Sequence, residues 1–272
     1  MPAKKDPITL CITSGKGGVG KTSLAVNLAF ALAEKGHSVL VVDGDLGLAN
    51  VDVLLGLSVR KTIRDVLDSG VDPLETVIYL EPNLGVLPAS SGVPEMVTLG
   101  PDEQTRLGHV LTSIAIHFDY ALIDTAAGIG PSVLWFNRFV NYNMVVLSPD
   151  PTSLTDAYAL IKVLAREYDR KSFYLIINFV KSSGEGRKTY EIIENVAKKF
   201  LDLDLLCLGT VPDDRAVQKA ARKQYPFIKE ASQSKAAQAV FEMADRIHRM
   251  KENRDYTKSR RKNNVSQMPF QV

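Results

Sequence analysis

The sequence predicts one doubly wound α/β domain, in which a mostly parallel sheet carries helices on both faces. Two observations lead to this fold class. Apolar runs of strand length alternate with stretches of helical period. These runs are uninterrupted, as expected for parallel strands that are covered on both faces. Because single helices separate the strands, we expect right-handed crossover connections within one sheet.

The elements follow one another in a regular order. The first helix comes directly after the first strand, with Ala25, Leu28 and Leu32 on one face and Gly36 where a left-handed residue ends a helix. The strands are expected at residues 8–13, 38–43, 84–87, 120–124, 144–148, 173–178 and 205–211. The helices are expected at residues 21–35, 103–117, 153–168, 188–201, 215–224 and 235–252.

Composition limits the kind of molecule. Hydrophobic residues make up 45% of the 272 residues, which excludes a disordered or collagen-like chain. The two cysteines, Cys11 and Cys207, form no CxxC motif, so we expect no iron–sulfur cluster. The first residues lead into an apolar run too short for a signal sequence, and no uncharged apolar stretch has the length of a membrane span. We therefore expect a cytoplasmic protein.

The net charge of +2 hides two segments of opposite charge. From Arg246 onward, eight basic residues face two acidic ones, a net charge of +6, so the preceding residues carry −4. We expect one domain at residues 1–252 and a basic, disordered tail at residues 253–272. This tail could contact anionic lipid, nucleic acid or an acidic protein, or it could be a solvated end.

One segment carries the strongest functional signal. Gly15-Lys16-Gly17-Gly18-Val19-Gly20-Lys21-Thr22 lies between the first strand and the first helix and matches the pattern GxxxxGK[ST] of phosphate-binding loops. Glycines let consecutive N–H groups face an anion, and the helix N-terminus adds a positive field. We expect Lys21 to reach the terminal phosphates of a nucleotide and the Thr22 hydroxyl to bind Mg²⁺, with Ser23 next to them.

Two strands end in carboxylates that should reach the same place. Asp43 and Asp45 end the second strand, and Asp124 ends the fourth. Parallel strands beside the first one bring their C-terminal tips to the phosphate site, so Asp43 and Asp124 are candidate metal ligands. Strand-end aspartates also form turns, which is the alternative. Gly128 lies in a loop after Asp124 that suits the sensing of a γ-phosphate.

The second residue of the loop motif, Lys16, is not explained by an ordinary phosphate-binding loop. With Lys21, it resembles the deviant Walker A motif of the MinD/ParA family of ATPases. The resemblance implies ATP and Mg²⁺ as ligands and a homodimer that holds ATP between its subunits. It also implies catalytic roles for three residues: Lys16, which reaches the partner's nucleotide, Lys21, and Asp45, which positions the attacking water.

The same resemblance assigns further residues. Asn178 matches an adenine-contacting asparagine, and Pro212, Asp213 and Asp214 match the loop that closes over the base. Asp156 matches an aspartate that pairs with the signature lysine or with the partner subunit; Ser153-Leu154-Thr155-Asp156 is equally close to a helix-capping box.

Within the family, residues 45–52, 148–162 and 215–221 are most similar to the FlhG branch, also called FleN or YlxH. This similarity implies a slow, partner-stimulated ATPase that regulates flagellar number or placement through flagellar assembly or regulatory proteins. Two alternatives stay open. Arg215, Lys219, Arg222 and Lys223 fit the non-specific DNA binding of a ParA-type partitioning ATPase, and a MinD-type division-site regulator would attach at the inner face of the membrane.

Overall fold

The structure is a computed structural model of the chain and describes residues 6–47, 50–89 and 100–265. Its described part contains an eight-stranded sheet in the order β3-β4-β2-β5-β1-β6-β7-β8. Neighbouring strands are parallel except for β3, which runs antiparallel to β4 at one edge. The strands are β1 (Ile8–Ser14), β2 (Val39–Gly44), β3 (Ile78–Glu81), β4 (Leu84–Leu87), β5 (Tyr120–Ala127), β6 (Tyr142–Leu147), β7 (Phe173–Val180) and β8 (Leu206–Pro212).

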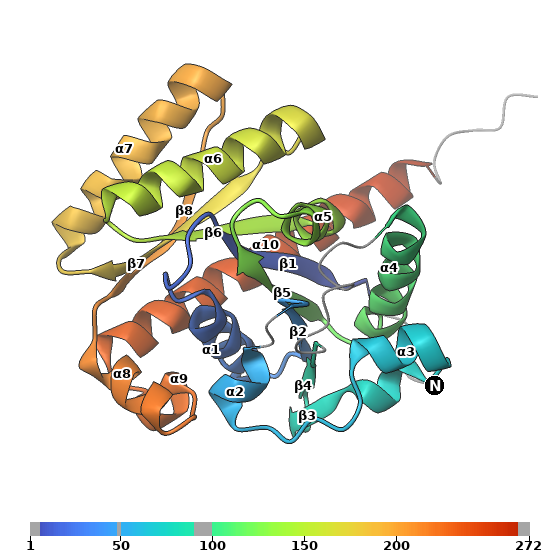
Figure 1. The fold of residues 1–272 in the computed structure, drawn as a ribbon. Coiled ribbons are helices and arrows are strands. Elements are labelled where there is room, and N and C mark those ends of the chain that lie inside the picture. The colour runs from blue at the N-terminus through green and yellow to red at the C-terminus, as the bar shows by residue number, and fades with distance from the viewer. Residues whose placement is uncertain (1–5, 48–49, 90–99, 266–272) are drawn as a thin grey trace, which may run out of the picture.

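Helices cover both faces of the sheet (Figure 1), which confirms the predicted doubly wound fold. One face carries α1 (Lys21–Glu34), α2 (Val51–Leu55), α8 (Arg215–Arg222), α9 (Phe227–Glu230) and α10 (Lys235–Val265). The other face carries α3 (Ile63–Ser69), α4 (Pro101–Ala115), α5 (Pro131–Phe139), α6 (Pro151–Tyr168) and α7 (Ser183–Leu201), with the short 3₁₀ turn η1 (Pro73–Thr76) nearby.

The central strand β1 shows why the apolar runs are uninterrupted. Its side chains alternate between the two faces: Leu10 and Ile12 pack with the α1 side, and Cys11 packs with the α4 side. All three are fully buried. Since both faces are covered by helices, both sets of positions must be apolar.

Several elements start or end away from the predicted positions. Helix α7 begins at Ser183 rather than at residue 188, because the Ser182 hydroxyl accepts a hydrogen bond from the Glu185 N–H and caps it. Helices α2, α3 and α9 and the edge strand β3 are short and lie between the expected elements.

The C-terminal segment differs most from the prediction. Helix α10 continues to Val265, so the residues expected to be disordered after residue 252 are helical up to that point; residues 266–272 lie outside the described part. Two ion pairs hold α10 on either side of residue 252: Lys251 Nζ lies 2.9 Å from Asp119 Oδ1, and an Arg254 Nη lies 2.7 Å from Asp6 Oδ1. No helix in the described ranges is both long and apolar enough to span a bilayer.

Candidate nucleotide site

The loop between β1 and α1 has the backbone of a phosphate cradle. Gly18 and Gly20 have φ angles of +77° and +90°, which glycine adopts without strain. A Cβ atom at Gly20 would lie 2.4 Å from Asn178 Nδ2, and one at Gly15 would lie 2.1 Å from the backbone oxygen of Asp156. No other part of the described structure lies within 4 Å of the Cβ position of Gly18. The loop is therefore packed on one side and open on the other.

Lys21 and Thr22 open α1 at the end of this loop. Lys21 is only 9% exposed, and its ammonium group has no hydrogen-bond partner among the described residues. Burial lowers the pKa of Lys21, while the carboxylates of Asp124 and Asp45 act in the opposite direction. A buried cation beside open N–H groups suits a bound phosphate, which would supply the missing acceptor.

The Asp124 carboxylate lies within β5, which runs on to Ala127 instead of ending at Asp124 as expected, and it is 1% exposed. Within the described part of the chain, neither of its oxygens has a hydrogen-bond partner of normal geometry, although Thr22 is close enough to act on its charge. Burial raises the pKa of Asp124 to about 7, with Asp43 adding to the rise and Thr22 and Lys21 opposing it. An orphaned carboxylate beside a hydroxyl matches the oxygen ligands that Mg²⁺ takes next to nucleotide phosphates.

Asp43 is the neighbour of Asp124 in the parallel register of β2 and β5. Its carboxylate accepts three backbone N–H groups, from Asn50 at 2.9 Å, Val51 at 3.1 Å and Asp45 at 3.1 Å. Burial nevertheless raises its pKa to about 6. Asp43 therefore holds the following loop and the start of α2, so its oxygens are less free for a metal than those of Asp124.

Lys16 reaches across to the first turn of α6. Its Nζ lies 2.6 Å from Asp150 Oδ2 and also donates to the Thr152 hydroxyl. This ion pair lowers the pKa of Asp150 to about 2. Asp150 is also the residue that caps α6, by accepting the Ser153 N–H at 3.3 Å, so the helix does not begin with the alternative capping box at Ser153. Within this chain Lys16 pairs with Asp150 and not with Asp156.

The residues expected to contact a base line one cleft, with a volume of about 30 Å³. Asn178 donates to the Val19 carbonyl at 2.9 Å and accepts the Phe179 N–H at 3.0 Å. Asp214 caps α8. Phe179 has a φ of +60°, a strained value for an aromatic residue, and is 39% exposed. The lining residues include Ser23, Asn178, Phe179, Pro212, Asp213 and Asp214.

The loop after β5 is tied to the phosphate loop. The Gly128 N–H donates to the Ser14 carbonyl at 2.8 Å, and Gly128 has a φ of +95°. A buried network continues from there: Asn137 of α5 donates to the Thr13 hydroxyl at 3.1 Å, and the Thr125 hydroxyl lies 3.3 Å from the same atom. Helix α5 is thus linked by hydrogen bonds to the strand that leads into the phosphate loop.

The sequence analysis did not predict that three residues contribute to the site: Asp150, Phe179 and Asn137. The signal for Asp150 was present, because an aspartate directly before Pro151 is a common helix start. Its contact with Lys16 could not be foreseen, since the two residues are far apart in the chain. Nothing in the sequence marks the positive φ of Phe179.

The fold and the loop together define a P-loop NTPase. A family model described as "ParA: NUBPL iron-transfer P-loop NTPase" matches residues 7–248, and the chain belongs to this ParA family. It is 41% identical to the antiactivator FleN of Pseudomonas aeruginosa over 239 residues, which cover 88% of this chain and 85% of FleN. The flagellum site-determining protein YlxH of Helicobacter pylori is 34% identical over 236 residues, which cover 86% of this chain and 80% of YlxH.

A solved structure supports the same assignment. The septum site-determining protein MinD of Pyrococcus horikoshii, complexed with Mg-ADP, matches with a TM-score of 0.74 and 26% identity over 89% of this chain and 96% of that one. The resemblance to the MinD/ParA family and to its FlhG branch is confirmed.

Proposed function

We propose that this chain is a Mg²⁺-dependent ATPase that switches by ATP-driven dimerisation and that regulates flagellar number or placement. One observation carries the proposal. The side chains of Lys21 and Lys16 lie in different surroundings. Lys21 is buried at its own phosphate loop, whereas the Lys16 side chain is 41% exposed and forms an ion pair with Asp150. A second lysine of the loop that does not turn toward its own phosphate site is suited to the nucleotide of another subunit.

The residues present fit ATP and Mg²⁺. The N–H groups of the open loop and the Lys21 ammonium would hold the phosphates, while the Thr22 hydroxyl and the orphaned Asp124 carboxylate would hold the metal. When bound, Mg²⁺ neutralises charge on the phosphate oxygens. Asp43 would support this arrangement by fixing the loop that carries Asp45, and Asp45 would orient the attacking water.

The base would enter the cleft between Asn178 and Pro212. The cleft, with a volume of about 30 Å³, is too small for a purine base, so we expect nucleotide binding to widen it. Phe179 stands at its edge, so movement of this ring is the simplest way to admit a base.

Dimerisation would complete the site. Lys16 would leave Asp150 and reach the partner's ATP, and Asp156, beside Gly15, would face the partner subunit. We propose that hydrolysis is slow until a partner protein completes the site, as an added arginine does in other P-loop proteins. A flagellar role is supported by the similarity to FleN, which is named an antiactivator, and to YlxH, which is named for determining the flagellum site.

Sizing by sedimentation tests this proposal. We expect the Asp45→Ala variant to form a dimer with Mg-ATP and a monomer with Mg-ADP, because it retains ATP. Lys16→Ala in the same background should remain monomeric with Mg-ATP. Asp52→Ala in that background, which alters a nearby carboxylate of α2, should form a dimer as the Asp45→Ala variant does. A monomer under all conditions would exclude the ATP-bridged dimer. If no candidate flagellar protein raises Mg²⁺-dependent hydrolysis by the wild-type chain, the proposed switch is wrong.

DNA partitioning is a second candidate, since Arg215, Lys219 and Arg222 of α8 are all exposed. ATP-dependent retention on duplex DNA that weakens as salt rises would favour it.

A further inference from the structure

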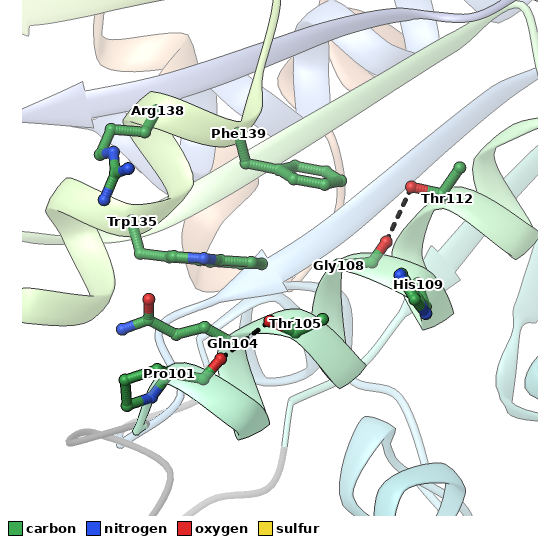
Figure 2. Close-up of a pocket in the computed structure, with 9 residues that line it drawn as sticks. All are labelled: Pro101, Gln104, Thr105, Gly108, His109, Thr112, Trp135, Arg138 and Phe139. Carbon is green, nitrogen blue, oxygen red and sulfur yellow. Dashed lines mark hydrogen bonds between the residues drawn. The ribbon is translucent and has the colours of Figure 1, made fainter. Parts of the chain in front are cut away.

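A groove lies between α4 and α5, and none of its lining residues belongs to the nucleotide site (Figure 2). Its volume is about 550 Å³. Helix α4 contributes residues three or four positions apart, which form one stripe, and α5 contributes a stripe from its last turns. The lining residues are Pro101, Gln104, Thr105, Gly108, His109, Thr112, Trp135, Arg138 and Phe139.

Aromatic rings form the α5 side of the groove. Trp135 and Phe139 are stacked, with centroids 5.3 Å apart and planes 17° from parallel. Both are half-buried, whereas their neighbour Phe136 is fully buried in the core. The structure leaves two of them at the surface, where apolar rings suit contact with another molecule.

Gly108 keeps the rings uncovered. It lies inside α4, where glycine destabilises a helix by about 1 kcal/mol relative to alanine. Space does not require it: a Cβ atom there would lie 3.6 Å from Phe139 and 3.7 Å from Trp135, which are ordinary contact distances. An alanine would therefore fit and would cover part of the aromatic surface. The glycine is explained if the opening itself has a use.

The polar groups of the groove favour an acidic partner. The Thr105 and Thr112 hydroxyls donate back to carbonyls of α4, so they are already satisfied. Among the described residues that line the groove, none is a carboxylate. Arg138 is exposed, lies over the Tyr168 ring at 4.9 Å, and has no ion pair with any described residue. With His109 on the opposite helix, the described part of the lining offers the Arg138 cation and further hydrogen-bond donors without a counter-charge.

We propose that the groove binds an acidic amphipathic helix of a partner protein. The stripe from Pro101 to Thr112 spans three turns, roughly 16 Å, which matches a short helix laid between two others. An apolar side chain of the partner rests on Trp135 and Phe139 opposite Gly108, and a carboxylate of the partner pairs with Arg138. This proposal does not depend on nucleotide hydrolysis.

Selection from a displayed library of amphipathic helical peptides tests the proposal. The apolar stripe is drawn from Leu, Met, Phe and Trp, and the polar face from Asp, Glu, Lys and Arg. Against the wild-type chain, we expect enrichment of Asp and Glu. The recovered peptides should bind Gly108→Leu, which fills the groove, and Arg138→Glu, which reverses its charge, about tenfold or more weakly than wild type.

Arg187→Glu is the matched control, because it reverses an exposed charge on α7 outside the groove. It should bind like wild type. Gly108→Leu should keep its thermal midpoint, since it replaces a glycine inside a helix, and Arg138→Glu changes an exposed position. The proposal is overturned if no recovered peptide distinguishes wild type from Gly108→Leu, or if the recovered peptides are basic. It is also overturned if the wild-type chain self-associates without nucleotide and Gly108→Leu abolishes that association, because the occupant is then a second copy.

Discussion

The ion pair between Lys16 and Asp150 keeps the loop lysine within its own chain. Dimerisation as proposed must break it, so the pair opposes association. Asp150→Asn tests this cleanly, because asparagine caps a helix as well as aspartate does but does not carry the charge. In the Asp45→Ala background with Mg-ATP, we expect Asp150→Asn to lower the dissociation constant of the dimer a few-fold. The effect is small because both side chains of the ion pair are partly exposed. Sedimentation equilibrium measures the change, and a dimer that is unchanged or weaker in Asp150→Asn would contradict the competition.

Asp124 makes the nucleotide-free protein less stable as pH rises. Burial raises its pKa from 3.8 to about 7. Its contribution to the free energy of unfolding is therefore largest below pH 4 and is lost as pH rises to about 7. Asp124→Asn removes this loss, so we expect the variant to exceed wild type by up to a few kcal/mol at pH 8 and by less at pH 5. Urea unfolding with EDTA and no nucleotide checks the difference. Asp52→Asn is the control, and an equal gain in that variant would show that Asp124 is not the cause.

Phe179 tests how the base is held. Its ring stands at the edge of a cleft that must open, and a base stacked on an aromatic ring gains about 1–3 kcal/mol. We expect Phe179→Ala to weaken ATP binding by roughly tenfold and Phe179→Tyr to keep it, as measured by calorimetry. Tighter binding by Phe179→Ala would mean that the ring only blocks the cleft.

The local sequence pattern identified many individual residues of the site, but it did not predict the contacts between them. The loop glycines, Lys21 and Asp124 were found because strand, loop and helix follow one another within a short segment. The Lys16–Asp150 pair joins residues that only the folded sheet brings together. Asp43 was expected to bind metal, and its three backbone hydrogen bonds emerge only when the loop up to Val51 folds back on it.

At the scale of elements, α10 extends past its apolar part by means of charge. Its buried residues end at Ile247, and Arg254 then makes hydrogen bonds to the Pro7 carbonyl at 3.0 Å, to Asn141 Oδ1 at 2.9 Å and to Asp6 Oδ1 at 2.7 Å. The side chain of Arg254 is 14% exposed.

Arg254→Ala should therefore lower the free energy of unfolding by about 1–3 kcal/mol, because it removes three hydrogen bonds that a largely buried guanidinium group makes. Arg249→Ala, which changes an exposed position of the same helix, should have little effect. Denaturant unfolding compares the two variants. Equal stability in both would mean that the end of α10 is not held by Arg254.

The inner strands and the long helices were predicted because each carries an apolar pattern over most of its length. The edge strand β3 has four residues with its Tyr79 side chain exposed, and α2 has only Val51 buried, so neither offers enough periodicity to recognise. The end of α10 was missed for the opposite reason. This part of the helix is held by Asp6 and Pro7, just before β1, and by Asp119, which a local pattern does not contain.

The charge of the whole molecule is distributed unevenly along the chain, and the structure indicates where a truncation would separate the basic end from the folded part. Removing the residues after Asp255 deletes four basic residues and no acidic ones, which changes the net charge from +2 to −2 while Arg254 keeps its contacts. We expect the shortened chain to lose any retention on anionic vesicles or duplex DNA at low salt and to keep its thermal midpoint. Co-sedimentation and DNA-column binding measure retention. Retention equal to that of the full chain would place the attraction elsewhere, with exposed α8 as the next surface to test.

The contact of Arg254 with Asp6 and Pro7 joins α10 to the start of the described fold, at the amino end of the central strand β1. The phosphate loop leaves the other end of β1, about 20 Å away across seven residues of strand. A fluorescent protein or a surface tether attached after Asp255 would therefore stand on the side away from the nucleotide and from a dimer formed around it. Single-molecule observation of ATP-driven pairing could thus use tethered chains without blocking the reaction under study.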